Sequence, residues 1–234
     1  MNILVCTIIR DRGVALQTWR DQLEAVVSGR PEDSFDLAVY ENDSQDGTKE
    51  ILKGLDFGFI ENSYITSEDL GTRYFGSTME PGRTEQLADV RNRCMELPPT
   101  LDVYDIIIWV EPDIMYGADD VLPVIEALVE GDLDVCTPYS WAAGPGVLYD
   151  TWATRPIHPY VHHPYPHGLI PVYSTWNCFC VYNAEPFKKG VRFIGGDCDT
   201  AQICVGLRCL GYDKIFVLAE KWIRHVQFME DFEK

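Results

Sequence analysis

The chain has 234 residues, of which 46% are hydrophobic and 24% charged, so it can bury the core of one α/β domain. Its 19 basic and 37 acidic side chains give a net charge of −18, which argues against nucleic acid or anionic lipid as a partner. No apolar run reaches the roughly 18 residues that span a bilayer, and the amino terminus lacks the features of a signal peptide. We therefore expect a cytoplasmic protein without a membrane span.

Apolar runs alternate with helical spacing along the first half of the chain. Asn2–Ile9 is an almost continuous apolar run, which is typical of a strand covered on both faces. The pattern then predicts, in chain order, a helix over residues 14–27, a strand over 35–41, a short helix around 51–55 and a strand over 57–66. Glycines and a proline in residues 67–83 indicate a loop that can close over a ligand.

The second half begins with the strongest strand signal of the chain, DIIIWVE at residues 105–111. It is preceded by a helix around 87–94 and followed by a helix over 121–129 and a strand over 133–138. Residues 140–171 have no period, and their four histidines favour an acceptor-side loop over a zinc site. A strand over 177–183, a helix over 200–210 and a strand over 214–218 complete the pattern, which predicts a Rossmann-related α/β fold with a mixed, mostly parallel sheet flanked by helices.

Eight cysteines raise the question of disulfide bonds. Most of them lie inside apolar runs, no CxxC pair is present, and we expect no signal peptide. We therefore expect buried free thiols.

Polar side chains follow the predicted strands at the edge where open α/β sheets bind their ligands. Arg10 follows the first strand, and Glu111 and Asp113 follow the strand over 105–111. Two carboxylates one residue apart can reach one hard cation, and oxygen donors are what Mg²⁺ or Mn²⁺ prefers. Two solvated loop acids are the alternative interpretation.

The second strand ends in an acidic turn, ENDSQDGT, which resembles the turn found in nucleotide-sugar transferases. Glu41 at the strand tip can accept hydrogen bonds from a base or ribose, and Asp43 lies in the same turn. With Thr7 and Arg10 at the end of the first strand, these residues are the predicted donor contacts. A capped turn with no ligand is the alternative, because Asp46 or Ser44 can cap the following helix.

Five segments in order resemble the cryptococcal capsule-associated mannosyltransferase family, glycosyltransferase family 69. They are RTEQLADVRNR at 83–93, YDIIIWVEPDIMYGADDVLPVI at 104–125, LYDTWATR at 148–155, VYSTWNCFCVYNAEPF at 172–187 and GGDCD at 195–199. The resemblance covers about residues 2–226 and implies one domain with a GT-A fold, a nucleotide-binding half (1–115) and an acceptor half (116–234). It also implies a nucleotide-sugar donor, a divalent cation (Mn²⁺ or Mg²⁺), and transfer of a hexose, with mannose favoured and its configuration retained.

The resemblance also implies roles for residues that bind the donor and the cation. Asp113 matches the acid after the central strand, whereas Glu111 departs from the family pattern. His225 corresponds to the histidine that supplies a further metal ligand in many GT-A enzymes, although a lone histidine is more often structural. Arg83 and Arg91 match the family helix, where an arginine binds a donor phosphate or clamps a carboxylate.

Four further residues are candidates for contact with the sugar and the acceptor. Asn177 is expected to hydrogen-bond the donor sugar, and Asp150 matches a loop that shapes the sugar pocket. Asp197 and Asp199 lie where an inverting enzyme of this fold keeps its base, and where a retaining enzyme positions the acceptor. A helix cap is the alternative role for Asp199.

Other functions remain open on the sequence alone. We expect the acceptor to be a hydroxyl group of a glycan or of another molecule. A modified DNA base or a protein is the alternative, and the net charge of −18 disfavours DNA. A nucleotidyltransferase shares the acid after a strand but usually has a glycine-rich loop after strand one. A sugar-binding module without catalysis would need no cation.

Overall fold

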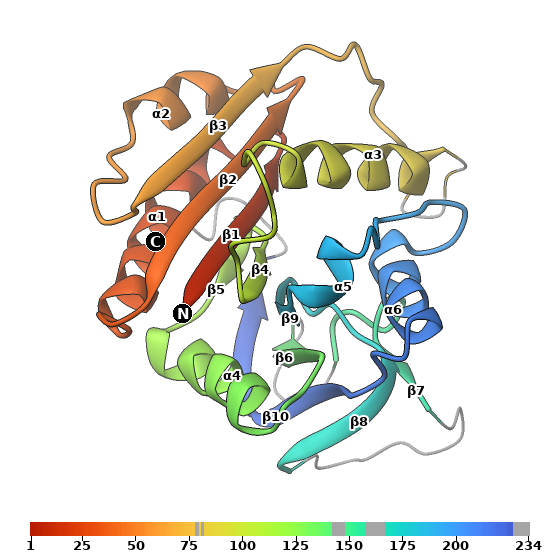
Figure 1. Ribbon diagram of the computed structural model, residues 1–234. Coiled ribbons are helices and arrows are strands. Elements are labelled where there is room, and N and C mark those ends of the chain that lie inside the picture. Colours follow the sequence, from red (N-terminus) through yellow and green to blue (C-terminus); the bar gives the residue numbers. More distant parts are fainter. Residues whose placement is uncertain (78–79, 81, 142–147, 158–166, 227–234) are drawn as a thin grey trace.

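The computed structural model describes residues 1–77, 80, 82–141, 148–157 and 167–226. Within them, the first half of the chain builds a parallel sheet, shown in red to green in Figure 1. The central strand β1 (Asn2–Ile9) pairs in parallel with two neighbours, β2 (Ser34–Asn42) and β4 (Ile106–Val110). β3 (Asn62–Glu68) pairs in parallel with β2 and forms one edge. β1, β2 and β4 are mostly buried because helices cover both of their faces, whereas the edge strand β3 is mostly exposed.

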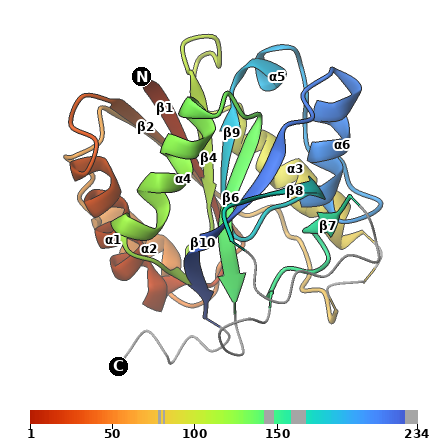
Figure 2. The ribbon, with the colours of Figure 1, turned by 90° about the horizontal axis from the view of Figure 1, so that it is seen from below.

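The second half adds strands of both directions. β9 (Phe179–Asn183) lies antiparallel between β4 and β6 (Val135–Trp141), and β10 (Ile215–His225) then runs parallel to β6 (Figure 2). The outer positions are taken by β8 (Leu169–Ser174) and β7 (Arg155–Pro156), and the short β5 (Ile114–Met115) pairs with the end of β10. The described sheet has the order β3-β2-β1-β4-β9-β6-β10-β8-β7, and more of its paired positions are parallel than antiparallel.

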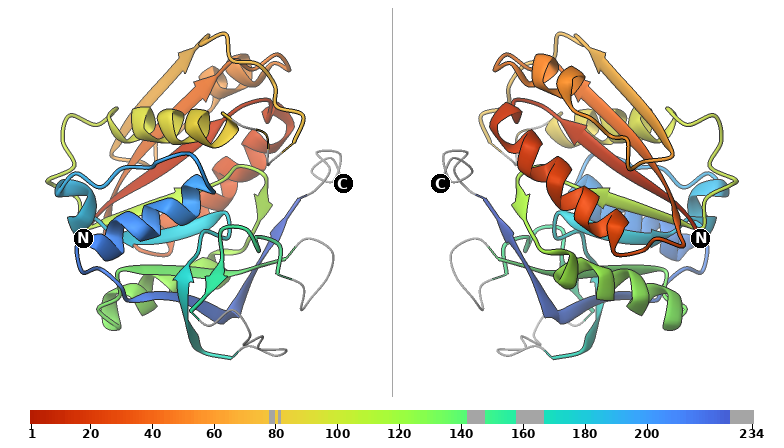
Figure 3. Two further views of the ribbon diagram at one scale, coloured as in Figure 1. Left: turned by 90° about the vertical axis from the view of Figure 1, so that its right-hand side faces the viewer. Right: turned by 90° about the vertical axis from the view of Figure 1, so that its left-hand side faces the viewer.

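Helices form a layer on each face of the sheet (Figure 3). α1 (Leu16–Ser28) packs against α4 (Ala118–Glu130) on one face, where the short α2 (Thr48–Gly54) also lies behind the 3-10 turn Gly13–Ala15. α3 (Arg83–Met95) and α6 (Asp199–Cys209) pack together on the other face, and α5 (Glu185–Lys188) follows β9. Among the described helices, none combines the length and the apolar character needed to cross a bilayer.

Several boundaries differ from the sequence-based expectation. The third strand begins at Asn62, because residues 57–60 form a turn in which the Ile60 backbone N–H donates to the Phe57 carbonyl at 2.9 Å. The last strand continues past residue 218 to His225, because a bulge lets β10 resume its pairing with β6 and then meet β5. Residues 140–171 contain β7 and the start of β8, while His158, His162 and His163 lie outside the described residues. All eight cysteines are free and seven are buried, as expected.

Candidate active site

A cavity of about 330 Å³ lies beyond the carboxyl ends of β1, β2 and β4. This volume falls in the range of pockets that bind small molecules. Tyr74 and Phe75 contribute aromatic surface to its wall. Its charged lining consists of five arginines and three carboxylates: Arg10, Arg12, Arg73, Arg83, Arg91, Asp11, Glu111 and Asp113. The pocket therefore gathers positive charge in a chain whose net charge is −18.

Arg10 is held in the wall of the cavity by the loop after β3. Its guanidinium donates to the hydroxyl and the carbonyl of Thr72, at 3.1 and 2.9 Å, and stacks over Tyr74 at 4.0 Å. Asp43 anchors this loop by accepting from the backbone N–H groups of Gly71 (2.8 Å) and Thr72 (3.2 Å). Burial alone would raise the pKa of Asp43, but hydrogen bonds from the Thr72 hydroxyl and the Asn42 amide, together with these backbone groups, outweigh it and lower the pKa to about 2. Asp43 does not itself line the cavity, and it contributes only by fixing the loop that holds Arg10 there.

Two of the predicted donor contacts are occupied inside the protein. Thr7 is fully buried, and its hydroxyl donates to the carbonyl of Val110 at 3.0 Å. Glu41 is also fully buried and accepts from the backbone N–H of Ser44 (2.9 Å) and from the hydroxyl of Ser67. Neither side chain lines the cavity, so the structure does not bring them to the other donor-site candidates.

Asn177 is likewise buried, in a polar network under the site. Its amide donates to the carbonyl of Pro138 at 2.8 Å and accepts from the hydroxyl of Thr154 at 3.0 Å. Asn177 and Cys178 both adopt left-handed backbone conformations, with φ of 50° and 61°. Non-glycine residues occupy this region at a cost, so the network around Asn177 holds a strained turn just before β9.

Arg91 lies at the centre of a buried ion cluster on α3. One of its terminal nitrogens contacts Asp199 at the start of α6, and the other donates to Glu111 Oε1 at 3.2 Å. Its guanidinium lies 4.7 Å from the ring centre of Trp176, whose indole N–H donates to the same Glu111 oxygen at 2.9 Å. Burial raises the pKa of Asp199, and the Arg91 charge opposes that rise. Arg91 therefore fixes both carboxylates, which is the clamp that the sequence left as one option.

Asp113 forms an ion pair with Arg12 just beyond the carboxyl end of β4. Two guanidinium nitrogens of Arg12 lie 3.0 and 3.1 Å from Asp113 Oδ2, and His225 Nε2 lies 3.8 Å from that oxygen. Asp113 Oδ1 and His225 Nδ1 are buried without a hydrogen-bond partner among the described residues. Burial raises the pKa of Asp113, as does the neighbouring Glu111, while Arg12 opposes them. The His225 ring stacks on Tyr149 with centroids 3.8 Å apart.

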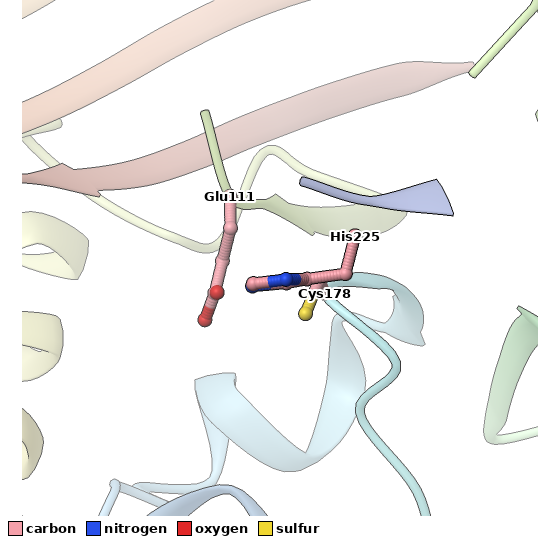
Figure 4. Close-up of side chains that lie close together, drawn as sticks. All are labelled: Glu111, Cys178 and His225. Atoms are coloured by element: carbon pink, nitrogen blue, oxygen red, sulfur yellow. The ribbon is translucent and has the colours of Figure 1, made fainter. Parts of the chain in front are cut away.

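Cys178 lies beside Glu111 and His225, and the sequence analysis did not predict it as a ligand. One donor atom from each of Glu111, Cys178 and His225 lies within 4.8 Å of the other two. Figure 4 shows the imidazole pointing toward the Glu111 carboxylate, with the thiol beside it. Burial raises the pKa of the Cys178 thiol well above its ordinary value. Its position directly after Asn177 was the signal available in the sequence. The predicted set of Glu111, Asp113 and His225 stays a prediction.

The two remaining acids, Asp197 and Asp150, differ in the pKa of their carboxyl groups. Asp197 receives both terminal nitrogens of Arg155, at 2.8 and 2.9 Å, and this bidentate pair lowers its pKa to about 2. Asp150 accepts from the backbone N–H of Ala153 at 3.2 Å, and burial raises its pKa to about 6. The two carboxylates therefore have opposite tendencies to hold a proton.

Known structures share this fold across nearly the whole chain. TarS of S. aureus is 14% identical with a TM-score of 0.61, over 99% of this chain and 38% of its own. PcManGT of Pyrobaculum calidifontis, solved with GDP-Man and Mn²⁺, is 12% identical with a TM-score of 0.61, over 95% of this chain and 56% of its own. GalNAc-T7, solved with UDP, GalNAc and Mn²⁺, is 11% identical with a TM-score of 0.61, over 97% of this chain and 44% of its own. This chain thus spans less than two thirds of each of these structures.

At such identities the likeness concerns the fold, which is the GT-A glycosyltransferase fold that the family resemblance implied. No curated protein sequence matches the chain. A family model described as cryptococcal mannosyltransferase 1 matches residues 2–210, which include every charged residue of the cavity. The chain therefore belongs to this family of glycosyltransferases, in agreement with the resemblance of its sequence motifs.

Proposed function

We propose that this chain transfers a hexose, with mannose favoured, from a nucleoside diphosphate sugar to a hydroxyl group of a glycan or another acceptor. The observation that carries the proposal is the cavity in which five arginines gather in a chain of net charge −18. A diphosphate is the ligand whose charge such a cluster would stabilise, and arginine is well suited to phosphate oxygens.

The placement of the donor follows from the walls of the cavity. Tyr74 and Phe75 offer aromatic surface to the base, while Arg10 and Arg83 lie where they can bind the phosphates. No carboxylate pairs with Arg83 among the described residues, so its charge is available to a ligand. The lining residues fall between Ile8 and Asp113, which supports a nucleotide-binding half at 1–115 and an acceptor half at 116–234.

A divalent cation, Mn²⁺ or Mg²⁺ by the resemblance, fits the donor atoms at this edge. Glu111, Asp113 and His225 would hold it, and the unpartnered Asp113 Oδ1 and His225 Nδ1 are buried polar atoms that such an ion would satisfy. When bound, the cation would stabilise the negative charge that develops on the leaving diphosphate. PcManGT and GalNAc-T7 were both solved with Mn²⁺.

The resemblance favours retention of configuration, and two of the predicted acids, Asp197 and Asp199 but not Asp150, are held in ion pairs. An inverting enzyme needs a free carboxylate to take the proton of the acceptor hydroxyl. Asp197 is instead locked to Arg155 with a pKa of about 2, and Asp199 is paired with Arg91. In a retaining reaction the acceptor would attack from the face that the diphosphate leaves, and a diphosphate oxygen would take the proton.

The proposal is tested by measuring binding and hydrolysis of GDP-mannose and of UDP-sugars in the presence of Mn²⁺. We expect one nucleotide sugar to bind, and Arg83→Gln to weaken binding about tenfold or more, because a hydrogen bond to a charged group contributes about 1.5–3 kcal/mol. Arg20→Gln is the matched control, since Arg20 lies on α1 and pairs with Asp21 and Glu24 outside the cavity. Equal affinity in wild type and Arg83→Gln, or no binding of any nucleotide sugar, would contradict the proposal.

The alternatives of the sequence analysis are compared in the same assay. Turnover of a nucleoside triphosphate with a sugar phosphate would indicate a nucleotidyltransferase, and binding without hydrolysis or transfer would indicate a sugar-binding module. The arginines line a cavity of about 330 Å³, which suits a nucleotide and not a duplex, so a DNA acceptor stays disfavoured.

A further inference from the structure

We propose that Cys178 is a cation ligand together with Glu111 and His225, so that this site binds thiophilic divalent cations of the Zn²⁺ class more tightly than Mn²⁺ or Mg²⁺. The inference rests on the proposed function, because it concerns the cation of the same site. It differs from the expected ligand set in placing a sulfur donor where Asp113 was expected.

The geometry brings the three donors together from separate parts of the chain. Glu111 follows β4, Cys178 precedes β9 and His225 ends β10, yet their donor atoms lie within 4.8 Å of one another (Figure 4). Zinc bonds of about 2.0–2.3 Å place tetrahedral ligands roughly 3.3–3.8 Å apart. Small side-chain rotations of about 1 Å would therefore close the set, and a backbone hydrogen bond of 2.9 Å from Glu111 N to Cys178 O keeps two of the ligands in register.

The oxygen donors at the site already share their charge with arginines. Asp113 Oδ2 is already bound by two nitrogens of Arg12, at 3.0 and 3.1 Å. The charge of Glu111 is likewise shared with Arg91, 3.2 Å from its Oε1. Oxygen donors alone would thus offer a cation less negative charge than their number suggests. A thiolate at Cys178 adds a full negative charge that no arginine contacts among the described residues.

Donor chemistry then decides which cation binds best. A set of sulfur, nitrogen and oxygen donors suits Zn²⁺ and its heavier analogue Cd²⁺, whereas Mg²⁺ and Mn²⁺ prefer oxygen. Binding replaces the S–H bond of Cys178 by a sulfur–cation bond, and the thiol proton goes to solvent. Three protein ligands leave a fourth position open, as in catalytic zinc sites, where a phosphate oxygen of the donor can bind.

The test is a titration of the full chain with Cd²⁺, whose bond to a thiolate absorbs in the ultraviolet. A Cys209→Ser background removes the exposed thiol. In it we expect one Cd²⁺ per chain with a thiolate absorption band, and Zn²⁺ should displace Cd²⁺ while Mn²⁺ competes weakly. Cys178→Ser should abolish the band and weaken Cd²⁺ binding at least about tenfold. Cys180→Ser is the matched control, because Cys180 is also buried and free but lies outside the donor set.

Each outcome of this titration decides the matter. Absence of the band in the background protein, or a band that survives in folded Cys178→Ser, would overturn the assignment. If Cys178→Ser does not fold, His225→Gln replaces it, because loss of the imidazole should also weaken Cd²⁺ binding while leaving every thiol in place. Unchanged Cd²⁺ affinity in His225→Gln would again overturn the assignment. Circular dichroism checks the fold of each variant.

The failure of this proposal is distinguishable from failure of the proposed function. Nucleotide-sugar binding with Mn²⁺ but no thiolate band would remove the sulfur ligand and keep the transferase. A thiolate band at Cys178 without binding of any nucleotide sugar would keep the cation site and remove the transferase.

Discussion

Arg91 is the residue whose removal tests the buried ion cluster most directly. Its side chain is 4% exposed and holds Asp199, itself 4% exposed, and Glu111. Arg91→Met keeps much of the side-chain volume but leaves Asp199 without a counter-charge. Breaking a buried pair in this way costs about 3–5 kcal/mol. In a chain of 150–250 residues, where 1 kcal/mol shifts Tm by about 2–4 °C, this corresponds to a fall of roughly 6–20 °C.

The same reasoning predicts recovery when the second charge is also removed. In Arg91→Met/Asp199→Leu no unpaired charge remains at the start of α6, and buried pairs can often be replaced by apolar groups at little cost. We therefore expect the double variant to regain most of the lost Tm. Arg93→Met is the matched control, because Arg93 lies on the same helix, is 44% exposed and pairs with Asp89. Its stability should change by no more than about 0.5 kcal/mol.

The assay is thermal unfolding followed by circular dichroism, with urea unfolding as a second measure of the free energy. A fall of Tm in Arg91→Met no larger than that in Arg93→Met would refute the buried cluster as a source of stability. A double variant no more stable than Arg91→Met would show that Asp199 is not the charge that Arg91 compensates.

Two further predictions concern pH and backbone packing. Burial raises the pKa of Asp150 to about 6, so ionisation of this carboxyl group destabilises the folded state above pH 6, and this penalty disappears below about pH 4. Asp150→Asn should therefore raise Tm at pH 7 and leave it unchanged at pH 3.5. An equal change of Tm at both pH values would contradict the raised pKa. A Cβ at Gly195 would lie under 3.0 Å from the backbone of Glu85, so Gly195→Ala should cost about 1–3 kcal/mol in urea unfolding. Gly54→Ala, with open space around its Cβ, should cost nothing, and similar losses in both glycine variants would argue against this close approach.

The sequence by itself determined the alternation of strands and helices and the edge of the sheet at which ligands bind. The first strand was predicted with the bounds it has, Asn2–Ile9, because a strand buried on both faces must be apolar throughout. Arg10, Glu111 and Asp113 all line the cavity, as their places after parallel strands predicted. These features are local, since burial pattern and strand direction set them without reference to distant residues.

Only the tertiary structure decided which polar groups meet. Arg91 and Asp199 are 108 residues apart, and Arg155 and Asp197 are 42 apart, so no periodicity in the sequence relates them. In the folded chain, the side chains of Thr7, Glu41 and Asn177 form internal hydrogen bonds. The fold also places Cys178 beside Glu111 and His225. The physical reason is that hydrophobic patterning reports which side of an element faces the core, whereas buried polar groups take whatever partners the assembled fold brings within reach.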